Sequence, residues 1–138
     1  IRPEYRLGDS RFDFFARRGE EKLLIEVKGC TLEEGGVARF PDAPTLRGLK
    51  HVRELTALCA QGWRCFVLLV IQMKGVRLFE PNWATHPEFG LALFAASRAG
   101  VEVLARDCIV TADSMTLDQP VPLGLCPPAG AGFGAIQP

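Results

Sequence analysis

Residues 45–71 read TLRGLKHVRELTALCAQGWRCFVLLVI, and two patterns in this stretch decide the fold class. Apolar residues recur through its first half at the three- and four-residue spacing of one helical face, which predicts a helix. Thr45 or its neighbour caps this helix, and Gly62 ends it. Cys65–Ile71 is an uninterrupted apolar run, typical of a central strand buried on both faces. A helix followed at once by such a strand indicates an α/β fold.

Short apolar runs bounded by turn residues predict further strands on either side of this stretch. Those before the helix span Glu4–Leu7, Phe12–Ala16, Lys22–Val27 and Val37–Phe40. After the central strand we expect an antiparallel neighbour at Val76–Phe79, a second helix at Pro87–Ala99 ended by Gly100, and a last strand at Val101–Ala105. Strands first and two α/β crossovers afterwards predict a mixed β-sheet flanked by helices, with right-handed connections.

Length and composition indicate one soluble globular domain. The chain has 138 residues, of which 48% are hydrophobic and 23% charged, close to the averages for such domains. We expect the domain to span residues 1–125 and Cys126–Pro138, rich in Gly, Pro and Ala, to form a flexible tail. The longest apolar run is far shorter than the ~20 residues of a membrane-spanning helix, so no membrane contact is expected.

Charge and cysteine content restrict the function classes. Equal numbers of basic and acidic residues, 16 each, argue against a strongly basic, non-specific nucleic-acid binder. Residues 1–70 nevertheless hold twelve Lys/Arg and ten Asp/Glu, so contact with a polyanion belongs to the first half. Five cysteines without a C-x-x-C pair indicate reduced thiols in a cytoplasmic protein rather than disulfides or a zinc site.

Three charged residues in the predicted strands form a candidate catalytic site. Asp13 lies in the middle of one strand, and Glu26 and Lys28 share one face of the next because side chains alternate along a strand. If the strands are adjacent, two carboxylates and a lysine can bind Mg²⁺ or Mn²⁺ and hydrolyse a phosphodiester. The alternative is a solvated Glu–Lys pair of the kind that surface strands often carry.

The first turns of the long helix hold three cation-capable side chains, Arg47, Lys50 and His51. A helix N-terminus with free N–H donors favours phosphate, and Arg and Lys add direct contacts, so these residues are candidates for nucleic-acid binding. The alternative is an exposed basic face without a ligand. Cys30 follows Lys28-Gly29 and has no His near it in the sequence, which favours a packed thiol over a nucleophile.

Five stretches extend the pattern around these residues: SRFDF (10–14), IEVKGCTL (25–32), FPDAPT (40–45), RGLKH (47–51) and GVEV (100–103). Together they resemble the sugar fermentation stimulation protein (SfsA) family, from about Pro3 to Leu125. The resemblance implies a restriction-endonuclease-like PD-(D/E)xK core and an association with DNA. It also implies catalytic roles for Asp13, Glu26 and Lys28, a Mg²⁺ or Mn²⁺ site at Asp13, Glu26 and Val27, and an extra acidic position at Glu4.

Three departures accompany this resemblance. Family members usually begin with a small OB-like β-barrel thought to bind DNA, and this chain starts at the nuclease-like core. Leu49 stands where Gln is common, and His86 where the helix-leading Asp-Pro is usual. We therefore expect only weak DNA binding by this chain alone.

Three functions remain open from the sequence. The first is a DNA-associated protein with a Mg²⁺-dependent phosphodiesterase site. The second is a non-cleaving DNA-binding regulator of sugar fermentation genes, and the third is an α/β interaction domain that binds no metal.

Overall fold

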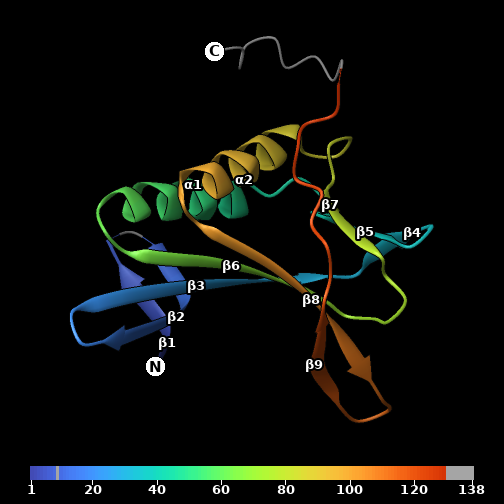
Figure 1. Ribbon diagram of the computed structural model, residues 1–138, viewed down its shortest axis with the longest axis horizontal. Helices are drawn as coiled ribbons and strands as arrows, with labels where there is room; N and C mark the ends of the chain where they lie inside the picture. Colours follow the sequence, from blue (N-terminus) through green and yellow to red (C-terminus); the bar gives the residue numbers. More distant parts are fainter. Residues whose placement is uncertain (9, 130–138) are drawn as a thin grey trace.

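The computed structural model describes residues 1–8 and 10–129, which form two β-sheets and two helices (Figure 1). The larger sheet has the strand order β1-β2-β3-β6-β8-β9 and the smaller one the order β4-β5-β7. The strands of the larger sheet are β1 (Arg2–Leu7), β2 (Ser10–Arg18), β3 (Glu21–Cys30), β6 (Arg64–Ile71), β8 (Glu102–Val110) and β9 (Met115–Pro120). Those of the smaller sheet are β4 (Leu32–Glu34), β5 (Val37–Phe40) and β7 (Leu78–Pro81), and the helices are α1 (Leu46–Ala60) and α2 (Pro87–Ala99).

Parallel strands form the centre of the larger sheet, and antiparallel strands extend it on both sides. Strands β3, β6 and β8 are parallel, whereas β1-β2-β3 and β8-β9 pair antiparallel. Both crossovers step in the same direction along the sheet, from β3 to β6 and from β6 to β8, so connections of one hand place α1 and α2 on the same face. The predicted α/β class and mixed sheet are confirmed.

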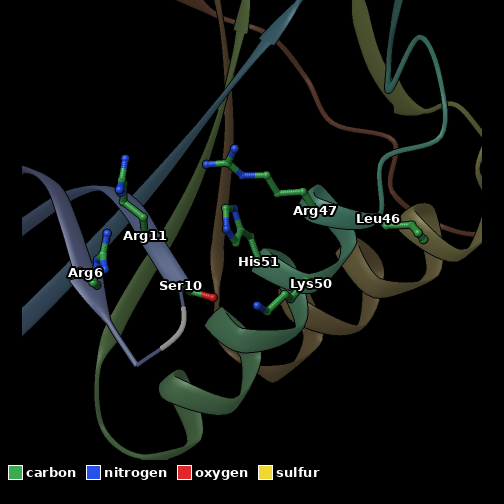
Figure 2. Close-up of a pocket in the computed structure, with 7 residues that line it drawn as sticks. All are labelled: Arg6, Ser10, Arg11, Leu46, Arg47, Lys50 and His51. Carbon is green, nitrogen blue, oxygen red and sulfur yellow. The ribbon is translucent and has the colours of Figure 1, made fainter.

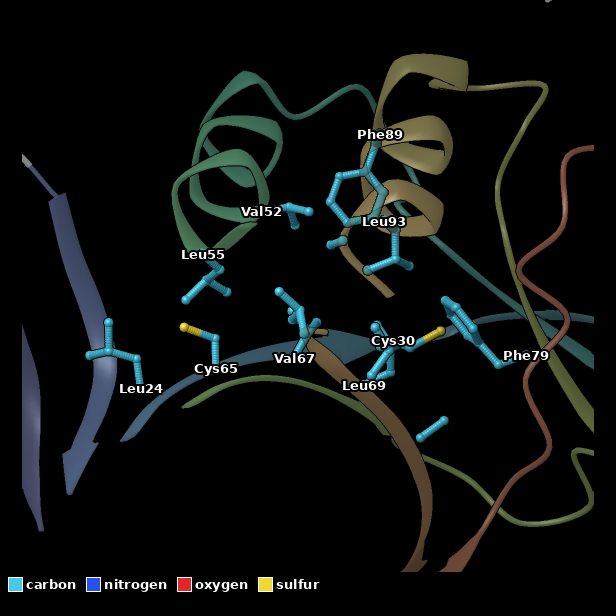
Figure 3. Close-up of a cluster of buried hydrophobic side chains, with 14 of the residues drawn as sticks. Leu24, Cys30, Val52, Leu55, Cys65, Val67, Leu69, Phe79, Phe89 and Leu93 are labelled. Carbon is cyan, nitrogen blue, oxygen red and sulfur yellow. The ribbon is translucent and has the colours of Figure 1, made fainter. Parts of the chain in front are cut away.

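The core fills the space between this sheet face and the two helices (Figure 3). Every second residue of β6, including Val67 and Leu69, is buried under α1 and α2. The intervening residues Phe66, Leu68 and Val70 are only half-buried. The central strand is therefore fully covered on one face, and not on both as its apolar run suggested, because both helices lie on the same side.

The predicted antiparallel neighbour of the central strand was wrong. Strand β7 pairs parallel with β5 in the smaller sheet and does not pair antiparallel with β6. The physical reason is that β3 and β8 already occupy both edges of β6, which leaves no hydrogen-bonding edge for β7.

The structure also shows two strands that the sequence did not predict, β4 and β9, and it extends β8 to Val110. The expected boundary after Leu125 stays a prediction, because residues 130–138 of the expected tail lie outside the described residues. Neither helix in the described ranges is long and apolar enough to cross a membrane.

Candidate metal and phosphate site

The carboxylates of Asp13 and Glu26 replace the backbone pairing between β2 and β3. The two strands pair regularly from Arg18–Glu21 to Phe14–Ile25, where the ladder stops. Beyond it, the Asp13 N–H donates to Glu26 Oε1 at 3.2 Å, and the Val27 N–H donates to Asp13 Oδ2 at 2.7 Å. Each carboxylate thus binds the backbone of the other strand, so the two acidic groups predicted from the sequence lie together.

The backbone around Asp13 is irregular on both sides. Phe12 and Phe15 are both buried although strict alternation would point them to opposite faces, so the phase of β2 changes at Asp13. On β1, Glu4 has φ of 51°, and the β1–β2 pairing omits Glu4 opposite Asp13. A left-handed backbone at a residue other than glycine costs on the order of 1–3 kcal/mol and concentrates at functional sites.

Glu26 is the most enclosed charged group of the cluster, with 3% of its surface exposed. Lys28 Nζ donates to its Oε2 at 3.0 Å, and His51 Nδ1 of α1 lies 2.5 Å from the same oxygen. Burial alone would raise the pKa of Glu26, but the charge of Lys28 and the hydrogen bonds with Lys28 and His51 hold it below its usual range. Glu26 therefore stays ionised inside the protein.

Asp13 has the opposite shift. Burial raises its pKa, and the nearby negative charge of Glu26 adds to this effect, outweighing the Val27 N–H and the charge of Lys28. Two neighbouring carboxylates with pKa values pushed apart are typical of sites in which the groups have different chemical tasks.

These donors fit a hard cation. Mg²⁺ prefers oxygen ligands and is commonly held by one or two carboxylates together with waters and substrate phosphate. The Val27 N–H points toward β2, and the carbonyl of a strand residue points to the same neighbour as its N–H, so the Val27 oxygen points toward β2 as well. In the described part of the chain no group of three or more His, Cys, Asp or Glu side chains could hold a metal ion, so a cation here would depend on the two carboxylates and on backbone oxygens.

A basic pocket of about 630 Å³ lies between α1 and the β1–β2 hairpin (Figure 2). Arg47 and Lys50 of α1 line one side, and Arg6 and Arg11 of β1 and β2 line the other. The two β-strand arginines were missed. The signal was present, because a hairpin centred on Gly8-Asp9 brings positions 6 and 11 opposite each other.

His51 connects the pocket to the carboxylates. The sequence predicts His51 as a nucleic-acid contact in the first turns of the helix. In the structure its side chain is buried, lies against Glu26 and also lines the pocket. Glu4, the extra acidic position, is exposed and lies 3.6 Å from Arg11 Nη1.

Cys30 and His86 have structural environments. The Cys30 Sγ donates to the Arg39 carbonyl at 3.2 Å, and burial raises its thiol pKa to about 11, which agrees with a packed, unreactive cysteine. His86 Nδ1 accepts a hydrogen bond from the Thr45 N–H at 3.2 Å and so joins the starts of the two helices.

The mixed sheet with its carboxylates and lysine at a break in the β2–β3 pairing defines the class of nuclease-like α/β domains. The chain belongs to the SfsA family, because residues 1–114 match the family model described as the Sugar fermentation stimulation protein RE domain.

Several known proteins are similar to this chain. It is 52% identical to a sugar fermentation stimulation protein homolog of Desulfitobacterium hafniense (strain Y51), covering 83% of this chain and 50% of that one. The homolog of Clostridium beijerinckii is 50% identical, with 85% of this chain and 52% of the relative covered. The solved structure of Pyrococcus furiosus SfsA in complex with Ca²⁺ has a TM-score of 0.83 and 28% identity, and the match covers 90% of this chain and 54% of that one. The chain thus spans about half the length of the relatives it matches.

Proposed function

We propose that this chain is a DNA-associated domain of the bacterial cytoplasm with a divalent-metal-dependent phosphodiesterase site. The observation that carries the proposal is the contact between Glu26 and His51, which joins a pair of carboxylates to a pocket lined by four Lys and Arg side chains. A scissile phosphate held in this pocket lies next to oxygen ligands for a cation. Five free cysteines, three of them buried, support a reducing compartment.

Asp13, Glu26 and the Val27 carbonyl are the proposed ligands for Mg²⁺ or Mn²⁺. When bound, such an ion polarises a phosphoryl oxygen and lowers the pKa of a bound water. Pyrococcus furiosus SfsA was solved with Ca²⁺, another cation that prefers oxygen ligands, which supports a divalent site in the family.

The remaining residues bind the DNA phosphates, orient the attacking water and neutralise negative charge. Arg47 and Lys50 hold the DNA backbone through its phosphates, which carry no base information, so the contact is independent of sequence. The Lys28 ammonium lies beside Glu26 with 14% of its side chain exposed, where it can orient the attacking water or offset charge that develops on phosphorus. With zero net charge, the chain should bind DNA weakly and with strong salt dependence.

A second candidate function is a non-cleaving DNA-binding regulator of sugar fermentation genes. One observation favours it. Lys28 and His51 both contact Glu26 Oε2, so the buried carboxylate of Glu26 already has hydrogen-bonding partners without a metal. The relatives' name, sugar fermentation stimulation protein homolog, agrees with a regulatory role.

The test is cleavage of supercoiled plasmid and of a single-stranded DNA circle in the presence of Mn²⁺. We expect cleavage by the wild type, loss of cleavage in Glu26→Ala, and a decrease of roughly 100-fold or more in Lys28→Ala, because removing one group that stabilises transition-state charge typically costs this much. The matched control is Lys22→Ala on the same face of β3, which should cleave at the wild-type rate.

Two results would contradict the proposed phosphodiesterase activity. Equal cleavage by all variants would point to a contaminating nuclease, and no cleavage of either DNA by the wild type would leave the non-cleaving regulator.

A further inference from the structure

The basic pocket carries cations on two facing walls. Arg6 and Arg11 come from the β1–β2 hairpin, and Arg47 and Lys50 come from the first turns of α1 (Figure 2). No carboxylate lines this pocket in the described ranges of the chain. A cavity with one sign of charge on both sides attracts an anion that reaches both walls at once.

The hairpin wall brings two positive charges together. Arg6 and Arg11 are directly opposite each other in the antiparallel β1–β2 pair, a position where like charges are destabilising. Glu4 lies 3.6 Å from Arg11, but both side chains are at least half exposed, so this ion pair is weak. The pair therefore presents two exposed cations to the pocket, where a bound anion would offset their mutual repulsion.

The size and lining of the pocket indicate which ligand it takes. Its volume of about 630 Å³ lies within the ~300–1,000 Å³ typical of pockets that enclose small-molecule ligands, enough for a short piece of one nucleic-acid strand. No Phe, Tyr or Trp side chain lines the pocket in the part of the chain described, so the bases find no stacking platform there and the contacts go to phosphates.

We propose that the β1–β2 hairpin and α1 clasp one DNA strand between them, with Arg6 and Arg11 on one side of its backbone and Arg47 and Lys50 on the other. This inference rests on the proposed function for its link to cleavage, and it names the substrate class of that site as single-stranded DNA. In a duplex the complementary strand lies beside this backbone, so we expect a single strand to fit between the two walls better than a duplex does.

The experiment measures binding of a labelled single-stranded oligonucleotide and of its duplex by fluorescence anisotropy, in EDTA so that no hydrolysis occurs. The test variant combines Arg6→Gln and Arg11→Gln. The control combines Arg17→Gln and Arg18→Gln, two exposed arginines at the far end of β2 that do not line the pocket.

We expect the wild type to bind the single strand more tightly than the duplex. The test variant should bind the single strand about tenfold more weakly, and the slope of log affinity against log salt should become shallower by ~0.7 for each phosphate that the variant no longer neutralises. The control variant should match the wild type. Thermal melting of the test variant should show an unchanged or higher Tm, because the two arginines repel each other.

The clasp is overturned if the duplex binds as tightly as the single strand, or if the test variant binds the single strand no more weakly than the control. Cleavage of the single-stranded circle decides the proposed function separately. If the single-stranded circle is cleaved but the binding results contradict the clasp, only the clasp proposal fails. If strand binding depends on Arg6 and Arg11 but no cleavage occurs, the phosphodiesterase proposal fails and the clasp proposal stands.

Discussion

Two neighbouring carboxylates at the site have unequal access to positive charge. Glu26 has Lys28 and His51 on the same oxygen, whereas Asp13 is bound mainly by the Val27 N–H. Asp13 in its ionised form is therefore disfavoured by burial and by the charge of Glu26. A divalent cation bound between the two carboxylates, as proposed, would offset this repulsion.

The first prediction concerns Asp13→Asn. The pKa of Asp13 is raised above its ordinary 3.8 in the folded protein, so the folded state holds this proton more tightly than the unfolded chain. The free energy of unfolding therefore falls as pH rises from 3.8 through the raised pKa. Asparagine keeps an oxygen for the Val27 N–H without the charge, and we expect it to raise the free energy of unfolding at pH 7 in metal-free buffer.

Urea denaturation at several pH values measures this effect. The gain should shrink as the pH falls toward 3.8, and Glu20→Gln, an exposed position in the β2–β3 turn, should show no comparable gain. A variant that is less stable than the wild type at pH 7 would show that Asp13 stabilises the fold as an ion.

At the residue scale, the sequence predicted the carboxylates and the lysine because strand alternation and hairpin adjacency are local rules. The burial of His51 was not predicted, because a polar residue was not counted when the buried face of the helix was identified from its apolar residues. Gly48, His51 and Leu55 follow one another at three- and four-residue spacing on the buried face of α1, so the position is buried whatever residue stands there.

Among the elements, α1 depends on its N-terminal cap to present the cations. Thr45 accepts a hydrogen bond from the Gly48 N–H at 2.9 Å, and its own N–H donates to His86 at the start of α2. The turn that carries Arg47 and Lys50 is thus held by the cap and by the second helix together. His86, which departs from the family pattern, acts here as a positioning residue for α1.

The second prediction is that Thr45→Ala lowers the free energy of unfolding by about 1 kcal/mol, because loss of an N-cap oxygen typically costs ~0.5–2 kcal/mol. Thr45→Ser keeps the oxygen and should stay within a few tenths of the wild type. Guanidinium denaturation measures both variants. Equal stability of Thr45→Ala and Thr45→Ser would mean that the contact with His86 alone holds the start of the helix.

The sequence predicted where strands form better than it predicted which strands pair. The region of β7 was recognised as strand-forming, but its partner depends on which edges of β6 are free, and β8 takes one of them only later in the chain. β9 is an exposed edge strand with the sequence MTLDQP, which lacks the apolar alternation that marks a half-buried strand. Its existence follows from the free edge of β8 and not from its own pattern.

On the scale of the whole molecule, the basic residues are unevenly distributed although the net charge is zero. The net charge of the chain is zero, yet four Lys and Arg side chains converge on one pocket between the first hairpin and the first helix. Elsewhere, acidic and basic groups pair with each other, as in the contacts of Lys74 with Asp107 and Asp118. We therefore expect a polyanion to bind at this pocket, close to His51 and Glu26.

The last prediction uses the stability of the whole domain to report on the metal site. A ligand that binds only the folded state stabilises it by mass action, by about 2.7 kcal/mol at a free concentration 100 times its Kd. For a domain of this size that corresponds to a Tm increase of several degrees. We expect millimolar Mn²⁺ or Mg²⁺ to raise the Tm of the wild type in a thermal melt monitored by circular dichroism.

Alanine at both Asp13 and Glu26 should abolish this increase, since it removes both carboxylate ligands. The control combines Glu20→Ala and Glu88→Ala, which removes two exposed carboxylates and should leave the increase intact. A wild-type melt unchanged by Mn²⁺ would exclude the metal site. An increase that survives in the Asp13 and Glu26 double variant would place the ion elsewhere, because an ion that still stabilises the fold without both carboxylates cannot be held by them.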